Sequence, residues 1–281
     1  MSVLTTTGPP AITDLAARLL ADINAGRTAR QSIPGNRALA FEWSTGLPMI
    51  LARQVQAATT DGLSFTAIRV EPSATPAARV AEGGPKPLAT AIESVPVSLS
   101  KYAGLATFST EQQLGTDALV PALASVIATS GLIAYDADCV AALAADHGPE
   151  VSGTDWPSAI NAGVAAVAAN GGSPQVLAIS AADYATAVQS PGVGYAVDPT
   201  QGVPTLWGLR IVISTAIPTG TAYVLDPYGV LAVELDTSPL AIVDPYSGLS
   251  TNEIRLAVEY FAAFVVTSPA VVAEVTVVPL P

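Results

Sequence analysis

Few side chains in this 281-residue sequence could carry acid–base, nucleophilic or metal chemistry. His147 is the only histidine and Cys139 the only cysteine. One chain therefore cannot form an internal disulfide, a cysteine-based zinc site or a histidine-rich metal site. A serine–histidine–aspartate triad would have to use His147, which precedes a glycine after a helical run. We interpret this histidine as a residue that caps the end of a helix.

Paired carboxylates are the other candidates for catalysis. Asp136 and Asp138 lie in a helical run, and Glu234 and Asp236 lie near the end of a short strand. A spacing of two residues places both side chains of a strand pair on one face, as a carboxylate-dependent hydrolase would need. Solvated charges near a strand end explain the same pattern. Nucleotide-binding and acyl-transfer strings such as GxGxxG and GxSxG do not occur, and we predict no cofactor or metal site.

The composition describes a folded chain with little charge. Half of the residues are apolar, 12% are charged and the mean hydropathy is +0.47, which excludes intrinsic disorder. The net charge of −12 argues against a basic surface that grips phosphates. Residues 1–70 hold six arginines and four acids, whereas residues 111–281 hold two arginines and 16 acids. The slightly basic N-terminal segment of one subunit could thus attract the acidic remainder of another. Neighbouring subunits could also cover much of the surface.

The first hundred residues read as an arm followed by a hairpin. Ile12–Ala25 has apolar residues at helical spacing, and residues 27–36 read as extended. Gly62–Val70 and Ser94–Ser100 alternate as strands do, and a segment rich in proline and glycine joins them. Pro96 cannot donate to a sheet, so it marks an edge strand. Because a hairpin alone has too little core, we expect it to lie on something else.

The rest of the chain predicts a long helix, a block of short helices and strands, and a long strand. The helix begins at Ser109, is interrupted near Pro121 and ends at Ala145; its many alanines suit close approach of a neighbour. The expected elements that follow are a helix that opens at Asp155 and ends at Asn170, strands at 175–180, 209–214, 222–225, 230–235 and 241–243, a helix at 181–189 with Ser180 or Asp183 near its start, a loop at 191–204, a long strand at 252–266 and a terminal strand at 270–278. The long strand has Ile254, Leu256, Val258 and Tyr260 on one face. This order is α+β and does not repeat a βα unit.

Three segments carry a resemblance to a known family. Ala81–Pro87 lies at the tip of the expected hairpin, Gly208–Pro218 reads as a strand and turn, and Asn252–Val272 contains the long strand. In this order and spacing the sequence resembles the major capsid proteins of tailed bacteriophages that have the HK97 fold. The resemblance covers nearly the whole chain.

The resemblance implies an α+β, HK97-like capsid fold with an N-terminal arm, an E-loop β-hairpin, a long spine helix, a peripheral domain and an axial domain. The expected parts are the arm (1–40), the first part of the peripheral domain (41–70), the E-loop and its return strand (71–105), the spine helix (106–149), the axial domain (150–245) and the second part of the peripheral domain (246–281).

The resemblance also implies that the protein is structural and is not an enzyme, apart from a possible self-catalysed cross-link between subunits. The expected product is an icosahedral virion capsid of hexamers and pentamers around double-stranded DNA, assembled in the cytoplasm of a bacterial host. Expected partners are a portal, a separate scaffold protein, a decoration protein and non-specifically contacted DNA. No membrane partner is expected, because the uncharged stretch Ala118–Tyr135 contains proline, serine, threonine and glycine.

Some members of the family join their subunits by isopeptide bonds, and the resemblance places that chemistry on three residues here. Lys86 would attack the side-chain amide of Asn252, and Glu259 would act as the base. Apolar surroundings lower the lysine pKa from about 10.4, and Tyr260, Phe261 and Phe264 could exclude water. An odd spacing puts Asn252 and Glu259 on opposite faces of a regular strand, so the resemblance implies that the three residues come from different subunits.

Besides the hydrolase, two alternatives to a phage coat protein remain open. An encapsulin-like nanocompartment shell would have the same fold and enclose a cargo enzyme. A tail or decoration protein would belong to the same particle but would not build a shell. A solvated arm lysine, a turn asparagine and a strand-edge glutamate would also explain Lys86, Asn252 and Glu259 without a cross-link.

Overall fold

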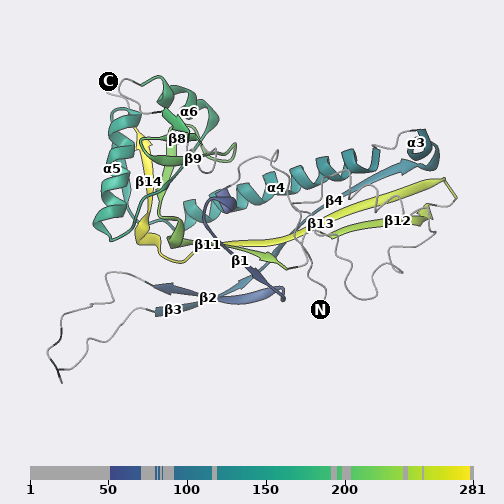
Figure 1. Ribbon diagram of the computed structural model, residues 1–281, viewed down its shortest axis with the longest axis horizontal. Coiled ribbons are helices and arrows are strands. Elements are labelled where there is room, and N and C mark those ends of the chain that lie inside the picture. Colours follow the sequence, from purple (N-terminus) through teal and green to yellow (C-terminus); the bar gives the residue numbers. More distant parts are fainter. Residues whose placement is uncertain are drawn as a thin grey trace, which may run out of the picture. The chain divides into compact units, whose positions relative to one another are not determined.

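The computed structural model describes residues 51–70, 80, 82, 84, 92–115, 119–190, 195–197, 204–236, 240–248 and 250–278. Within these ranges the chain divides into two compact units (Figure 1). Unit 1 contains residues 100–134 and 235–262, and unit 2 contains residues 51–99, 135–234 and 263–278. The helix expected at Ile12–Ala25, the extended arm and Lys86 lie outside the described residues.

Unit 1 is built on a long strand, β13 (Glu253–Val266), which pairs with strands on both of its sides. β4 (Ser100–Ser109) and β12 (Leu240–Gly248) both run antiparallel to β13. Alternate residues of β13 are buried, which confirms the predicted alternation. The buried core of this unit joins the sheet to α4 (Leu119–Ala145), and its members are Phe108, Val120, Ala124, Ala128, Val243, Ile254, Leu256 and Val258.

The helical segment that follows β4 starts as the sequence predicted. In α3 (Thr110–Gly115) the Ser109 hydroxyl oxygen accepts from the Gln112 N–H at 3.2 Å, and the Gln112 side-chain oxygen accepts from the Ser109 N–H at 2.9 Å. This reciprocal pair is a capping box. α3 ends at Gly115, and α4 begins at Leu119 with Pro121 in its first turn and ends at Ala145 as predicted. A Cβ on Gly104 of β4 would lie 2.5 Å from the Ile127 Cγ2 atom, so glycine permits the helix to pack closely on the sheet.

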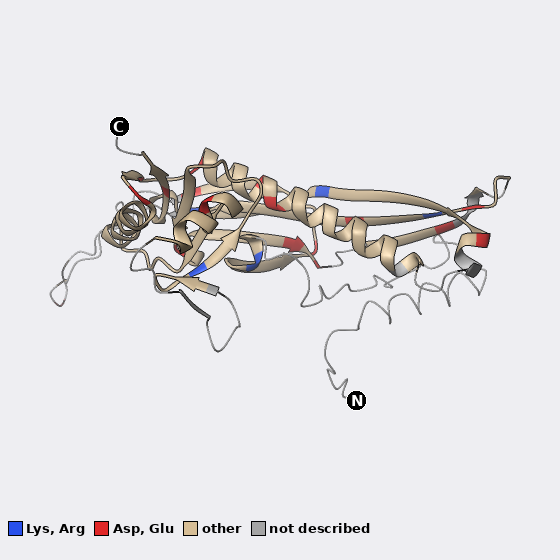
Figure 2. Cartoon of the chain, turned by 90° about the horizontal axis from the view of Figure 1, so that it is seen from above, with Lys and Arg blue, Asp and Glu red and all other residues tan. Residues whose placement is uncertain are grey.

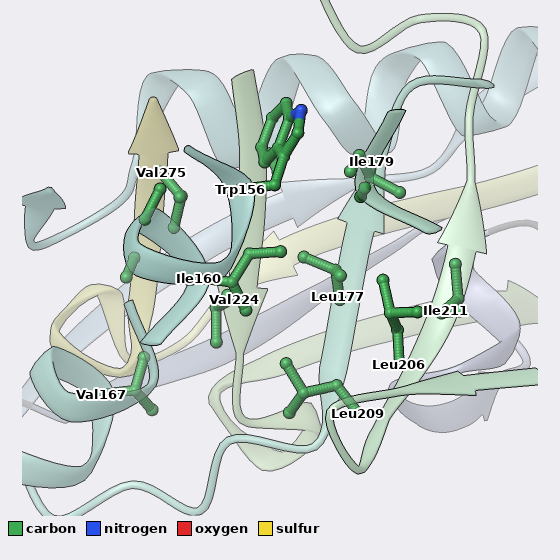
Figure 3. Packing of buried hydrophobic residues seen from close by; sticks show 14 of the residues in the cluster. Trp156, Ile160, Val167, Leu177, Ile179, Leu206, Leu209, Ile211, Val224 and Val275 are labelled. Carbon is green, nitrogen blue, oxygen red and sulfur yellow. The ribbon is translucent and has the colours of Figure 1, made fainter. Parts of the chain in front are cut away.

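Unit 2 contains a seven-stranded sheet with the order β5-β14-β10-β6-β9-β8-β7. These strands are β5 (Glu150–Gly153), β14 (Val272–Val277), β10 (Thr221–Leu225), β6 (Val176–Ile179), β9 (Leu209–Ile213), β8 (Pro204–Leu206) and β7 (Tyr195–Val197). Figure 3 shows Trp156, Ile160 and Val167 beside apolar side chains of the central strands. All of the labelled residues belong to one buried cluster, which is the main core of the unit.

Two helices of unit 2 begin with the capping residues that the sequence indicated. In α5 (Trp156–Ala169) the Asp155 carboxylate accepts from the Ser158 N–H at 2.8 Å. In α6 (Ala181–Val188) the Ser180 hydroxyl oxygen accepts from the Asp183 N–H at 3.1 Å. Such side chains satisfy N–H groups that the first turn of a helix leaves without a partner.

The predicted hairpin is present as a two-stranded sheet of β2 (Ser64–Val70) and β3 (Ile92–Ser98). Pro96 lies opposite Thr66, on a strand that pairs with β2 alone among the described strands. Leu63 and Ile68 are more than half exposed, so the hairpin has little core of its own, as expected. Within unit 2, Arg69, one residue before the end of β2, forms an ion pair with Asp146.

Strand pairing joins segments that are distant in sequence and corrects one expectation. β14, the predicted terminal strand, joins the seven-stranded sheet of unit 2. β11 (Val230–Leu235) and β12 pair in the sheet of β13. The expected loop at 191–204 contains β7, which pairs with β8. Pairing depends on partners distant in sequence, and local pattern does not specify them.

His147 does not cap the helix. Its Nε2 atom lies 3.1 Å from the Glu274 carboxylate on β14, and its ring centroid lies 6.5 Å from that of Tyr223. Burial and the Glu274 carboxylate raise the pKa of Tyr223 to about 12. The expectation failed because the chain turns back onto the sheet at Gly148, whose N–H donates to the Val272 carbonyl at 3.0 Å.

A buried carboxylate on α4 fixes two distant segments of unit 2. The Asp136 Oδ1 atom accepts from the Leu51 N–H at 2.9 Å, and its Oδ2 atom accepts from the Ser214 hydroxyl. Asp136 is 7% exposed. Leu51 begins the short helix η1 (Leu51–Arg53), and Ser214 directly follows β9. One side chain therefore holds the start of η1 and the end of β9 against the same helix.

Replacing Asp136 by alanine should lower the free energy of unfolding by about 2 kcal/mol, because a buried N–H and a buried hydroxyl lose their acceptor. D61A, in an exposed turn of unit 2, should change it by less than about 0.5 kcal/mol. Denaturant unfolding of the unassembled subunit measures both. Equal effects of the two substitutions would contradict the role given to Asp136.

Candidate assembly and cross-linking sites

Asn252 lies in an exposed turn directly before β13 in unit 1. Its backbone is left-handed, with φ at 57°, and its carbonyl accepts from the Thr110 N–H at 3.1 Å. Its side-chain Nδ2 donates to the Glu111 carboxylate at 2.6 Å. The pKa of Glu111 is lowered, chiefly by its backbone hydrogen bond, then by Ser109 and to a smaller extent by Asn252. The amide that would be attacked is thus held at the surface by a defined partner.

The left-handed conformation predicts a difference between two substitutions at position 252. N252A should lower the free energy of unfolding by about 1 kcal/mol more than N252G, because alanine is strained at positive φ and glycine is not. Both variants lose the bond to Glu111, so their difference isolates the backbone effect. Thermal unfolding of the two variants measures it, and an N252A variant as stable as N252G would contradict the assigned conformation.

Glu259 lies on β13 and already has a partner within its own chain. Its carboxylate forms an ion pair with Lys101 of β4, and the Lys101 Nζ atom lies 5.8 Å from the centre of the Phe261 ring. The register places Phe261 opposite Lys101 and Glu259 opposite Ala103. The side chain of Glu259 is 20% exposed and that of Lys101 is 48% exposed. Sequence reasoning missed this pair, because only the register of two strands brings the residues together.

One subunit does not bring Asn252 and Glu259 together. Seven residues of strand at about 3.3 Å each separate them by roughly 23 Å. The parity argument does not apply to Asn252, because this residue precedes the strand and is left-handed. The separation alone leads to the same expectation, that the residues of a cross-link come from different copies. Lys86 lies outside the described residues.

Only part of the expected apolar shield lies beside Glu259. Phe261 is on the same face of β13 as Glu259, two residues along. Tyr260 is buried on the opposite face, with its ring centroid 6.3 Å from that of Tyr102. Of these two residues, Phe261 is therefore the one placed to restrict water near the carboxylate.

The outer face of α4 in unit 1 is apolar and uncharged. Val126 is 64% exposed and Ile133 is 50% exposed. The other exposed positions of the helix within this unit are Ala122, Ser130 and Ala134. Most of this helix is tan in Figure 2, because it has no lysine or arginine and its two acids, Asp136 and Asp138, lie beyond unit 1. The span Ala122–Ala145 is long and apolar enough, by length and composition alone, to cross a membrane. A core helix passes the same test, and α4 packs one side against its sheet.

A model of a family of phage capsid proteins matches residues 92–275, which is more than half of the chain. The chain belongs to the phage capsid protein family. No curated protein matches the sequence. The sequence resemblance to major capsid proteins is therefore confirmed, and this chain is a major capsid protein.

Solved structures show that the fold is the HK97-like capsid fold. A structure from Mycobacterium phage Ogopogo has a TM-score of 0.60 at 15% identity, with 84% of this chain and 94% of that chain covered. The capsid of an empty GTA particle, computed with C5 symmetry, has a TM-score of 0.60 at 15% identity, with 85% and 94% covered. A virus-like particle from Pyrococcus furiosus has a TM-score of 0.52 at 13% identity, with 81% and 92% covered.

The carboxylate pairs of this capsid protein do not form a catalytic dyad. Asp136 is buried and bonded to Leu51 and Ser214, whereas Asp138 is exposed. Glu234 is the penultimate residue of β11 and Asp236 lies in the turn after the strand, so a regular strand does not hold both. Among the described residues, no group of three or more histidine, cysteine, aspartate or glutamate side chains could hold a metal ion. The geometry gives the hydrolase alternative no support.

Proposed function

We propose that this capsid protein assembles as hexamers and pentamers into a closed icosahedral shell around double-stranded phage DNA. The observation that carries the proposal is the exposed, uncharged face of α4. An isolated subunit would leave Val126 and Ile133 in water, whereas a neighbouring subunit would cover them. The GTA capsid with a similar fold was computed with C5 symmetry, the symmetry that a pentamer has.

A charge on this face should prevent assembly without unfolding the subunit. V126E/I133E should abolish shells in electron micrographs, because two carboxylates would have to be buried at the contact. The circular dichroism spectrum should stay unchanged, because both positions are exposed in the single chain. T219E, in an exposed turn of unit 2, serves as the control and should form round shells as the wild type does. Shells of normal yield from V126E/I133E, or a wild type that remains monomeric, would overturn the assignment.

The acidic composition fits DNA that is enclosed but weakly held. A chain with a net charge of −12 repels phosphates at most of its surface, so contacts with packaged DNA would be non-specific. Assembly in the bacterial cytoplasm, with a portal, a separate scaffold and a decoration protein, belongs to the same proposal.

An encapsulin-like shell is the second candidate, because the Pyrococcus furiosus virus-like particle shares the fold. The contents of particles purified from their natural source distinguish the two functions. Nuclease-protected DNA supports the phage coat, whereas a co-purifying enzyme with no DNA supports the nanocompartment.

We further propose that neighbouring subunits form an isopeptide bond between Lys86 and Asn252. The neutral Lys86 amine attacks the Asn252 side-chain carbonyl carbon, a C–N bond forms, and the amide nitrogen leaves as ammonia. Glu259 of another copy takes the proton that the amine loses and passes it to the leaving nitrogen. The exposed position of Asn252 and the partly buried carboxylate of Glu259 support this arrangement.

The two lysines of the chain provide a matched test of the cross-link. Wild-type shells boiled in SDS should give ladders of bands above 28.3 kDa, and K86R and N252G should each give a single band. K101R should keep the ladder, because arginine preserves the charge beside Glu259. A single band from wild-type shells would exclude the bond, and a ladder lost in K101R but kept in K86R would assign it to the other lysine.

A further inference from the structure

Unit 2 contains an open, polar groove that the shell contacts discussed above do not involve. Its volume is about 450 Å³, and its lining residues are Arg53, Gln54, Val55, Gln56, Gln175, Arg210, Pro227 and Tyr228. Two arginines and three glutamines line it, and no acidic residue does. The groove is therefore positive within a chain whose net charge is −12.

Three fixed segments present these side chains. Arg53 ends η1, whose first residue is held by the buried Asp136 carboxylate. Arg210 lies on β9, and its N–H donates to the Gln175 carbonyl at 2.8 Å. Tyr228 lies in the short helix η3 (Pro227–Gly229), where its N–H donates to the Asp226 carboxylate at 2.9 Å. A groove that is already ordered loses little conformational entropy when it binds.

The charge of Arg210 has no partner inside the described part of the chain. No hydrogen bond or ion pair of its guanidinium is formed with the described residues. Asp226, the carboxylate nearest to Tyr228 in sequence, directs its oxygens to the N–H groups of Ser173 and Tyr228. Residues 111–281 hold only two arginines against 16 acids, and one of these two lies in the groove. The guanidinium of Arg210 is therefore able to bind a carboxylate from outside the subunit.

We propose that this groove receives a carboxylate-bearing segment of a second copy of this chain. The proposal rests on the assembly proposed above, which surrounds each groove with acidic copies. Tyrosine and arginine are the residues that most often carry the energy of protein–protein contacts, and Tyr228 is 72% exposed at the rim. Two arginines are too few for a surface that holds DNA by its phosphates, which needs many contacts.

Neutralising the groove should weaken assembly. R53Q/R210Q should raise the protein concentration needed for shell formation by about tenfold, as the loss of interfacial charge pairs does. R53K/R210K keeps both charges but loses the paired N–H donors of arginine, so it should assemble at a concentration between those of the wild type and R53Q/R210Q. R255Q removes an exposed arginine of β13 outside the groove and should assemble normally. Light scattering of nuclease-treated protein measures all four, and circular dichroism verifies that each is folded.

Zero-length cross-linking identifies the partner group. Carbodiimide treatment of assembled R53K/R210K shells should join an amine introduced at position 53 or 210 to a glutamate or aspartate of another copy. Mass spectrometry of mixed isotope-labelled and unlabelled subunits distinguishes a bond between copies from one within a chain. A bond of mixed label supports the proposal, whereas no bond at either position, or bonds within one chain only, overturns it.

Two further outcomes separate this inference from the proposed function. If wild-type protein forms no shells, the proposed function fails and the groove loses its partner. If wild-type and R53Q/R210Q proteins form shells at the same concentration, only the groove proposal fails. A double variant that assembles normally but binds double-stranded DNA at least tenfold more weakly would also overturn it, because nucleic acid would then be the occupant.

Discussion

The packing of α4 against the sheet of β13 in unit 1 positions the apolar outer face of the helix and the two described cross-link candidates, Asn252 and Glu259. Leu256 and Val258 are buried on one face of β13 and belong to the same core as Ala124 and Ala128 of the helix. With that side of α4 buried, Val126 and Ile133 are left outside. The register of β13 with β4 then brings Lys101 to Glu259, and the turn before β13 holds Asn252 at the surface. A coat subunit's apolar outer surface and its candidate cross-link residues thus depend on one sheet and one helix.

Low charge and fixed charges serve different roles in this protein. Within unit 1 the outer face of α4 carries no charge, so a neighbour can cover it without desolvating ions. Several charged side chains of the described residues are held by specific partners. Asp136 is buried and hydrogen-bonded, Arg69 pairs with Asp146, and Lys101 pairs with Glu259. Against this background, a groove with two arginines and no lining acid is unusual within the subunit. A shell needs contacts that are weak singly and specific together, and placed charges provide specificity more than affinity.

Local pattern predicted most elements of the described chain because local physics determines them. The capping residues Ser109, Asp155 and Ser180 each bond the N–H groups that helix starts leave open. The alternation along β13 predicted its buried face, because successive side chains of a strand point to opposite sides. The same reasoning failed for His147, whose partner Glu274 lies far away in the sequence. It predicted β14 as a strand but could not give its neighbours in the sheet.

By itself the sequence determined the α+β order of elements, the low charge of the coat subunit and its resemblance to phage capsid proteins. Hydrophobic periodicity, capping residues and composition are local properties, so the amino-acid sequence alone contains them. Only the tertiary structure decided that Lys101 pairs with Glu259, that β14 belongs to the seven-stranded sheet, and that Arg53 and Arg210 line one groove. Each of these depends on which distant segments become neighbours, and strand register, unlike strand propensity, is set by packing across the whole fold.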